Sequence, residues 1–233
     1  MKLKSWVPEK IYQQYLKPFD LNHLHRLGKR IYSQEGEDIL IERYLGKKSK
    51  GFYIDIGAHH PFRFSNTYYF YRQGWSGINI EPNPELFGLL SKHRPHDINL
   101  NIGLSDKPQD LTYYYFEEAA YNTFSHEIAM QLIANKNILI RKEQIATTTL
   151  PLALKNLILP TNIDFLSIDT EGMDLNILMT NDWDSLRPQL ILAELKVDSL
   201  RLALESKMNQ YLEQSNYRLV SKLYNTILFK RLD

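Results

Sequence analysis

Acidic side chains stand at the ends of several short apolar segments of this chain. Asp55 lies within the run FYIDIG, Glu81 follows GINI, and Asp169 follows FLSI. A fourth acid, Glu194, ends the run LILAE. A carboxylate at the edge of a buried sheet is costly unless it is paired, hydrogen-bonded or holding a ligand. Each acid taken singly could be a helix cap, but four in equivalent places predict a ligand site.

Alternating strand and helix patterns indicate how these acids come together. Short apolar runs within residues 51–60, 77–81, 97–104, 163–168 and 189–194 predict buried strands. Between them, helices are predicted from Ser33 to Gly46, from Ser65 or Asn66 to Gln73, and from Asn83 onward. Further helices are predicted over residues 127–134, 152–159 and 200–214. This order predicts an α/β fold with a mostly parallel sheet.

The end of the chain and its middle depart from this alternation. The runs YRLVSKL and TILFKRL predict a terminal hairpin, so the last strand should insert antiparallel into the sheet. Over residues 111–150 the pattern loosens, and this segment is predicted to be an insertion on the substrate side. Residues 1–32, rich in aromatic and basic side chains with one short helix near residues 9–16, are interpreted as a docking arm. Residues 33–233 are then expected to form a single domain.

Composition excludes several classes of protein. The chain has 233 residues, of which 43% are hydrophobic, which is enough for one sizeable core. It has no cysteine, so neither a disulfide framework nor a thiolate zinc site is expected. With 28 basic and 27 acidic residues it lacks the basic excess of nucleic-acid-binding proteins. Neither a membrane span nor a signal peptide is predicted, so a cytoplasmic location is the expectation. Nothing in the sequence indicates the oligomeric state.

The turn after the first strand restricts the ligand. Glu81 lies 26 residues after Asp55 (81 − 55 = 26), near the position where nucleotide-binding folds place an acid on the ribose hydroxyls. Dinucleotide sites also need G-x-G-x-x-G to cradle a pyrophosphate, whereas residues 57–61 read GAHHP. A ligand with a ribose but no phosphate fits better, and S-adenosylmethionine is one. A nicotinamide-dependent oxidoreductase remains the less favoured alternative.

The segments GFYIDIGAHHP, SNTYYFYRQGWSGINIEPNPE, NIGLSD and FLSIDTEGMDLNIL together resemble the FkbM-like family of S-adenosylmethionine-dependent methyltransferases. The resemblance covers roughly residues 33–195, in the family's order. It implies the class I methyltransferase fold, Rossmann-like, with a seven-stranded sheet and an antiparallel last strand. It also implies methylation of a hydroxyl group on a sugar, a glycan or another small molecule, as in polysaccharide biosynthesis. A non-catalytic binding protein with the same fold is the alternative of another class.

The resemblance implies which residues surround the cofactor. Those beside its methionine part would be Asp55, Gly57, Ala58, Gln34, Ser65 and Asn66. Those beside its adenosine would be Glu81 on the ribose, and Pro82, Asn83, Gly103, Leu104 and Ser105 around the adenine. Asp169, Glu171 and Gly172 match the D-x-E-G motif above the transferable methyl group. The chain departs from the family at His59-His60-Pro61, where a small or acidic residue and a glycine are common, and at Ser167, where a lysine is common.

Methyl transfer to a hydroxyl group also needs a base within hydrogen-bond reach. Asp169 is the first candidate because a strand end fixes its position, and His59 and His60 are further candidates since histidine titrates near neutral pH. Each histidine could equally be a surface or capping residue. If a divalent cation such as Mg²⁺ or Mn²⁺ is present, its ligands would be Asp169, Glu171 and Glu194. The acceptor is expected to contact the inserted segment at Tyr121, Asn122 and Thr123, with the aromatic residues 68–71 as a second candidate surface that could equally be core.

Overall fold

A computed structural model describes residues 30–232. The chain divides into two units, residues 1–31 and residues 32–233, and all helices and strands of the described residues belong to the second. The docking arm expected over residues 1–32, with its helix near residues 9–16, falls almost wholly outside the described residues. Its role stays a prediction.

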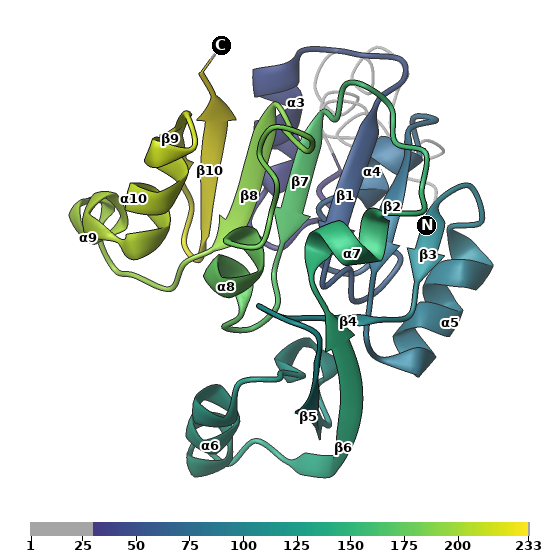
Figure 1. The fold of residues 1–233 in the computed structure, drawn as a ribbon, viewed down its shortest axis with the longest axis vertical. Coiled ribbons are helices and arrows are strands. Elements are labelled where there is room, and N and C mark those ends of the chain that lie inside the picture. Colours follow the sequence, from purple (N-terminus) through teal and green to yellow (C-terminus); the bar gives the residue numbers. More distant parts are fainter. Residues whose placement is uncertain (1–29, 233) are drawn as a thin grey trace, which may run out of the picture. The chain divides into compact units, whose positions relative to one another are not determined.

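A seven-stranded sheet organises this second unit, in the strand order β3-β2-β1-β7-β8-β10-β9 (Figure 1). Its strands are β1 (Phe52–Ile56), β2 (Ser76–Ile80), β3 (Ile98–Leu100), β7 (Phe165–Ile168), β8 (Leu190–Glu194), β9 (Tyr217–Lys222) and β10 (Thr226–Arg231). The neighbouring strands β3, β2, β1, β7 and β8 pair in parallel in that order. Strand β10 is antiparallel to both β8 and β9. The predicted mostly parallel sheet with an antiparallel hairpin strand is confirmed.

The central strands of the sheet are buried because an apolar layer covers each of its two faces. On one face Ile54 and Ile56 of β1 belong to a cluster with Leu150 of α7 (Leu150–Leu154), Ile177 of α8 (Asp174–Leu178) and Leu212 of α10 (Lys207–Gln214). On the other face Tyr53 packs with Ile41 of α3 (Glu37–Leu45) and Phe70 of α4 (Tyr68–Tyr71). Side chains alternate along a strand, so Asp55 shares the face of Tyr53.

Local hydrogen bonds explain where the helices begin. The side chain of Asn83 accepts from the amides of Glu85 and Leu86, so α5 (Pro84–His93) starts at its predicted cap. The helix predicted from Ser33 starts later, because Gly36 at α3's N-cap has φ 93° and Ser33 instead bonds Asp38. The helix predicted over residues 200–214 is two helices, α9 (Leu200–Glu205) and α10, because Ser206 is extended and caps the second.

A second, three-stranded sheet lies beyond the carboxyl ends of the parallel strands (Figure 1). It contains β4 (Gly103–Leu104), β5 (Gln109–Phe116) and β6 (Leu139–Thr148), with the 3-10 turn η4 (Ala119–Tyr121) and the helix α6 (His126–Ala134) between β5 and β6. The single strand predicted over residues 97–104 is therefore divided between two sheets. The break lies at Asn101, whose side-chain amide group donates to the carbonyl oxygens of Glu81 and Pro82 at 2.8 and 3.0 Å.

Within residues 30–232, every helix is too short or too polar to cross a lipid bilayer.

Candidate active site

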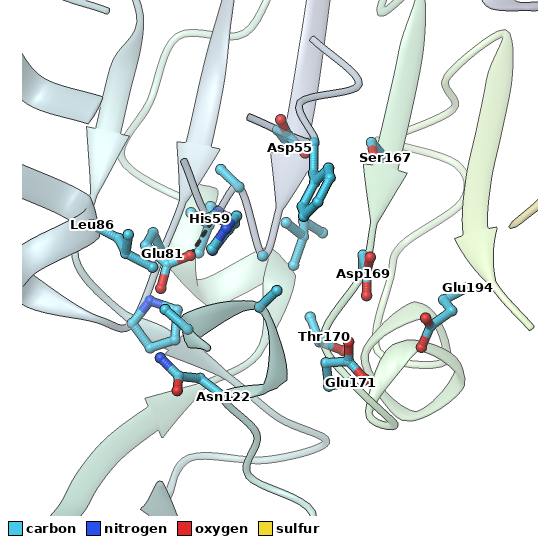
Figure 2. A pocket seen from close by; sticks show the side chains of 18 of the residues that line it. Asp55, His59, Glu81, Leu86, Asn122, Ser167, Asp169, Thr170, Glu171 and Glu194 are labelled. Carbon is cyan, nitrogen blue, oxygen red and sulfur yellow. Dashed lines mark hydrogen bonds between the residues drawn. The ribbon is translucent and has the colours of Figure 1, made fainter. Parts of the chain in front are cut away.

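A cavity of about 400 Å³ opens at the carboxyl ends of β1, β2, β7 and β8, and η4 and the adjoining loop of the inserted segment also line it. The chain runs from β1 to β2 on one side and from β7 to β8 on the other, so β1 and β7 flank the point where the strand order reverses. Ligands of open α/β sheets bind at this point. Figure 2 shows Asp55, Glu81, Asp169 and Glu194 around this space.

The turn after β1 is tightly packed, and its first three amides are hydrogen-bonded within the protein. Gly57 has φ 76°, and a Cβ added there would stand 1.8 Å from the carbonyl oxygen of Asp169, so only glycine fits. The amides of Gly57 and Ala58 both donate to the carbonyl oxygen of Ile80, at 2.9 and 3.2 Å. The amide of His59 donates to Glu81 at 2.8 Å. These three amides therefore bind protein atoms and Pro61 has no amide proton, so the turn is a poor cradle for a pyrophosphate.

Glu81 is held at the tip of β2 by two backbone amides. One carboxylate oxygen accepts from His59 and the other from Asn83, both at 2.8 Å. Burial raises the pKa of Glu81 to about 7, although both amide bonds act against the rise. A carboxylate oxygen has two lone pairs, so each oxygen keeps one for a ligand hydroxyl. This geometry suits the pair of hydroxyls on a ribose.

Apolar side chains surround Glu81 on the side of the second sheet. The cavity wall there contains Pro82, Leu86, Ile102, Leu104 and Phe124. A flat ring beside a ribose site would find apolar side chains in this wall.

Three residues predicted beside the adenine do not line the cavity. Asn83 uses its side chain to cap α5. Gly103 packs against the ring of Phe124. A Cβ added at Gly103 would stand 2.7 Å from the Cζ atom of that ring. Ser105 is buried and bonds the carbonyl oxygen of Lys107 and the hydroxyl of Thr147. All three support the wall from behind.

The residues predicted at the methionine end do border the cavity, which is lined there by Gln34, Ser65 and Asn66. The hydroxyl of Ser65 accepts from the amide of Tyr68, and Asn66 donates to Ser167 at 3.0 Å. The aromatic residues 68–71 of α4 do not line the cavity, and Phe70 belongs to the core.

Three carboxylates and one ammonium group gather at the opposite end from Glu81. Asp169, Glu171 and Glu194 place one oxygen each within 4.8 Å of one another. Lys196 bonds Glu171 at 2.7 Å and Glu194 at 2.9 Å. The pKa of Asp169 is raised well above its ordinary range. The main cause is desolvation by the surrounding protein, followed by the negative charges of Glu194 and Glu171. Burial, with Glu171, raises the pKa of Glu194 to about 7.

The same three carboxylates are those predicted to hold Mg²⁺ or Mn²⁺. Lys196 already supplies a positive charge to two of them, so the cluster has a counter-ion of its own. A divalent cation would have to displace that ammonium group to use the carboxylates as ligands.

Asp174 orients this end of the cavity without lining it. It is buried, and one of its oxygens accepts from both the amide and the hydroxyl of Thr170, at 2.8 and 2.5 Å. Its other oxygen accepts from the amide of Glu194 at 3.0 Å. Asp174 therefore fixes the turn after β7 against the end of β8, which brings Asp169, Glu171 and Glu194 together.

The two histidines have different surroundings. His59 lines the cavity with φ 53°, and its Nε2 is buried with no hydrogen-bond partner among the described residues. Burial lowers the pKa of His59 to about 4, so it is neutral near pH 7 and a weak base. His60 does not line the cavity, and its Nδ1 accepts from the amides of Phe62 and Arg63. His60 shapes the turn.

The residues predicted to contact the acceptor lie where the inserted segment meets the loop after β1. Tyr121 and Asn122 line the cavity, whereas Thr123 is buried and donates to the carbonyl oxygen of Glu171 at 2.8 Å. Arg63 and Glu118 also line it and form a two-pronged ion pair with distances of 3.0 and 2.7 Å. This pair connects the loop after β1 with η4.

Sequence reasoning did not identify several residues of the cavity. They are Arg63, Phe64, Tyr113, Glu118, Thr170, Lys196 and Asn225. Lys196 had a usable signal, since it follows Glu194 by two positions at a strand end. The others lie mostly in loops, where periodicity carries no information.

The fold, with its cavity at the carboxyl ends of the parallel strands, is similar to the folds of solved methyltransferases. The METTL16 methyltransferase domain superposes with a TM-score of 0.50 at 12% identity, over 88% of this chain and 71% of that one. A TehB-like SAM-dependent methyltransferase from Corynebacterium glutamicum gives 0.43 at 10% identity, over 97% and 100%. The 1,6-didemethyltoxoflavin-N1-methyltransferase of Burkholderia thailandensis, solved with S-adenosylhomocysteine, gives 0.43 at 11% identity, over 97% and 92%.

The sequence model of the FkbM methyltransferase domain matches residues 55–219, more than half of the chain. The chain therefore belongs to the FkbM methyltransferase family, as its motifs predicted. No curated protein sequence matches it.

Proposed function

We propose that this protein is an S-adenosylmethionine-dependent O-methyltransferase acting on a hydroxyl group of a sugar, a glycan or another small metabolite. One observation carries the proposal: a single cavity joins Glu81, a ribose-type carboxylate, to the acidic cluster of Asp169, Glu171 and Glu194. Such a cavity suits a ligand with a ribose at one end and positive charge at the other. At about 400 Å³ it lies within the usual range for ligand pockets.

The charge of the cavity supports this cofactor. Its described lining contains six carboxylates and two permanent cations, namely Asp55, Glu81, Glu118, Asp169, Glu171 and Glu194 against Arg63 and Lys196. An acid-rich site attracts a sulfonium and an ammonium group, and it repels phosphate. Together with the occupied amides of the β1 turn, this makes a nicotinamide dinucleotide a poor fit.

When bound, S-adenosylmethionine supplies an electrophilic methyl group on a positively charged sulfur. The acceptor oxygen forms the new bond to carbon as the carbon–sulfur bond breaks, and the acceptor's proton must go to a base. Asp169 is the proposed base, because its neighbours raise its pKa and so make it a better proton acceptor than an ordinary aspartate. His59 is the weaker candidate. The proposal includes no metal ion, since Lys196 already occupies the cluster.

The acceptor is proposed to enter between the loop after β1 and η4. Phe64 and Tyr121 line the cavity there and are 42% and 39% exposed, so both offer aromatic faces to a ligand. Phe64 also has φ 56°, and backbone strain of this kind concentrates at ligand sites. Hydroxyl-bearing rings pack well on such faces and bond polar groups at their edges.

Calorimetry with S-adenosylhomocysteine tests the cofactor, and NAD in the same titration tests the oxidoreductase alternative. We expect saturable binding of S-adenosylhomocysteine and none of NAD. Absence of binding by the folded chain would end the methyltransferase proposal in this form.

An acceptor screen with labelled S-adenosylmethionine tests the reaction. It should cover sugars, sugar nucleotides and glycans, each with and without EDTA. We expect transfer to a hydroxyl group, unaffected by EDTA. Binding of the cofactor without transfer to any acceptor would favour the non-catalytic alternative.

A further inference from the structure

A buried polar network lies behind Asp55, on the face of the sheet covered by α3 and α4. Its centre is Arg94, which caps the end of α5 and is fully buried. Arg94 pairs with Asp97 at 2.8 Å. Asp97 also accepts from the hydroxyl of Tyr53, the amide of Gly77 and the side chain of Asn79. Buried charges are rare and costly unless paired and hydrogen-bonded, and this pair is both.

The network reaches the cavity through one hydroxyl group. Arg94 donates to the hydroxyl of Thr67 at 3.1 Å, and Thr67 donates to Asp55 at 2.7 Å. A guanidinium can only donate and a carboxylate can only accept, so the single proton of Thr67 points to Asp55. Ser65, whose oxygen lies 3.3 Å from that of Thr67, must therefore donate to Thr67. All these hydrogen bonds point in one direction, toward the carboxylate that lines the cavity.

We infer that Thr67 is a positioning residue, which links the buried guanidinium of Arg94 to Asp55 through its hydroxyl group and orients that carboxylate, as the ionised form, toward the cofactor. Asp55 faces the cavity, and its assignment to the cofactor rests on the proposed function. The connection between Arg94, Thr67 and Asp55 stands on the geometry alone.

The surroundings of Asp55 explain why such support matters. Burial raises the pKa of Asp55 to about 6, whereas the hydrogen bond from Thr67, the charge of Arg94 and a bond from Ser167 of β7 hold it down. The negative charges near it are Asp97 within the network and Glu81 across the turn. Without the Thr67 hydroxyl, Asp55 would take up a proton near neutral pH and lose its attraction for a cationic ligand.

The experiment is a carboxyl carbon-13 NMR titration of the free, full-length protein, in which Asp55→Asn identifies the signal. Hydrogen bonds to charged groups are worth about 1.5–3 kcal/mol, which corresponds to about one to two pH units. We expect Thr67→Val to raise the pH midpoint of the Asp55 titration by about that amount. Thr67→Ser, which keeps the hydroxyl group, should have the midpoint of the parent protein. Thr147→Val changes another buried threonine, whose hydroxyl bonds Ser105 and Gln109 instead of Asp55, and should leave the pH midpoint of the Asp55 titration unchanged. If Thr67→Val does not fold, Thr67→Ala removes the same hydroxyl.

Cofactor binding provides the second measurement. Thr67→Val should weaken binding of S-adenosylmethionine more than binding of S-adenosylhomocysteine, which lacks the sulfonium charge. In a protein that already carries Asp55→Asn, the additional change Thr67→Val should not weaken the binding of either ligand further. An unchanged midpoint in Thr67→Val overturns the inference even if the parent binds both ligands. A shifted midpoint in a protein that binds neither ligand supports the connection but refutes the proposed function.

Discussion

Glu81 titrates in the range where the protein would work. Each of its oxygens accepts one backbone amide, and burial raises its pKa to about 7. Burial therefore favours the protonated form of Glu81 in the free protein. Ribose hydroxyls donate to the ionised form, so cofactor binding should release a proton and strengthen as the pH rises from about 5.5 to 8.

Glu81→Ala should weaken binding of S-adenosylhomocysteine by about ten- to a hundredfold. Hydrogen bonds to a charged acceptor are worth about 1.5–3 kcal/mol, and the variant loses both that ribose hydroxyls would make. Calorimetry measures the affinity, and Glu85→Ala is the matched control because Glu85 lies four residues later and outside the cavity. Equal affinity of Glu81→Ala and the parent would refute the ribose assignment.

Asp169→Asn should lower turnover by about 10²-fold or more while changing cofactor affinity little. The amide keeps the shape of the side chain but removes its basicity, and general-base catalysis contributes roughly that factor. Single-turnover rates and calorimetry on one variant separate the two effects. If affinity falls and saturated turnover survives, Asp169 holds the cofactor's amino group and another residue is the base.

The sequence predicted one half of this site better than the other. Strand ends are fixed by apolar periodicity, so Asp55, Glu81, Asp169 and Glu194 could be placed at one edge of the sheet. The position of Lys196 two residues after Glu194 was a usable signal, but its pairing with Glu171 could not be predicted, because that contact depends on the turn that Asp174 orients. His60 shows the limit of motif reading, since its ring turned out to bind two amides of its own loop.

At the scale of elements, the turn after β1 should tolerate no side chain at Gly57. Gly57→Ala must accommodate a Cβ that would stand 1.8 Å from the Asp169 carbonyl oxygen, at φ +76°. Gly74→Ala is the matched control, since Gly74 has φ +88° but no atom within 4 Å of the added Cβ. Strain at positive φ costs about 1–3 kcal/mol, and Gly57→Ala adds a clash to it.

Thermal unfolding and calorimetry on both variants give the comparison. We expect Gly57→Ala to lower the Tm further than Gly74→Ala and to weaken S-adenosylhomocysteine binding, because β1 and the turn after β7 must move apart. Equal losses of stability in the two variants would show that the contact between Gly57 and Asp169 is not tight.

Most elements were predictable because their signals are local. Asn83-Pro84 predicted the start of α5, and the two alternating runs predicted the β9–β10 hairpin. The division of residues 97–104 between two sheets was not predictable, since it depends on Asn101 reaching the carbonyl oxygens of Glu81 and Pro82. Neither was the long pairing of β5 with β6, whose register joins residues far apart in the sequence.

For the whole molecule, the free protein should become less stable as the pH rises from about 4.5 to 7. Burial raises the pKa values of Asp55 and Asp174 to about 6 and of Glu81 and Glu194 to about 7. The folded protein thus keeps protons that the unfolded chain releases near pH 4, so the free energy of unfolding falls through this window.

Differential scanning calorimetry between pH 5 and pH 8 checks the direction. For a protein of this size, a loss of ~2 kcal/mol lowers the Tm by roughly 4–8 °C. Saturating S-adenosylhomocysteine should reduce the slope, because ligand contacts favour the ionised carboxylates. A Tm that rises steadily over the same range would contradict the raised pKa values.

The way the inserted segment joins the rest of the molecule bears on how such proteins diversify. Its entry and exit lie side by side, since Gly103 and Leu104 of β4 pair with Thr147 and Thr148 of β6. The chain thus leaves and re-enters the rest of the domain at neighbouring positions, and residues 105–146 lie between these paired ends. An exchange of residues 105–146 would replace Tyr121 and Asn122 on the proposed acceptor side, and Phe124 in the wall beside Glu81, while Glu81, Asp55 and Asp169 stay in place. Under the proposed function, such an exchange would therefore change the acceptor contacts and one wall of the adenosine end together.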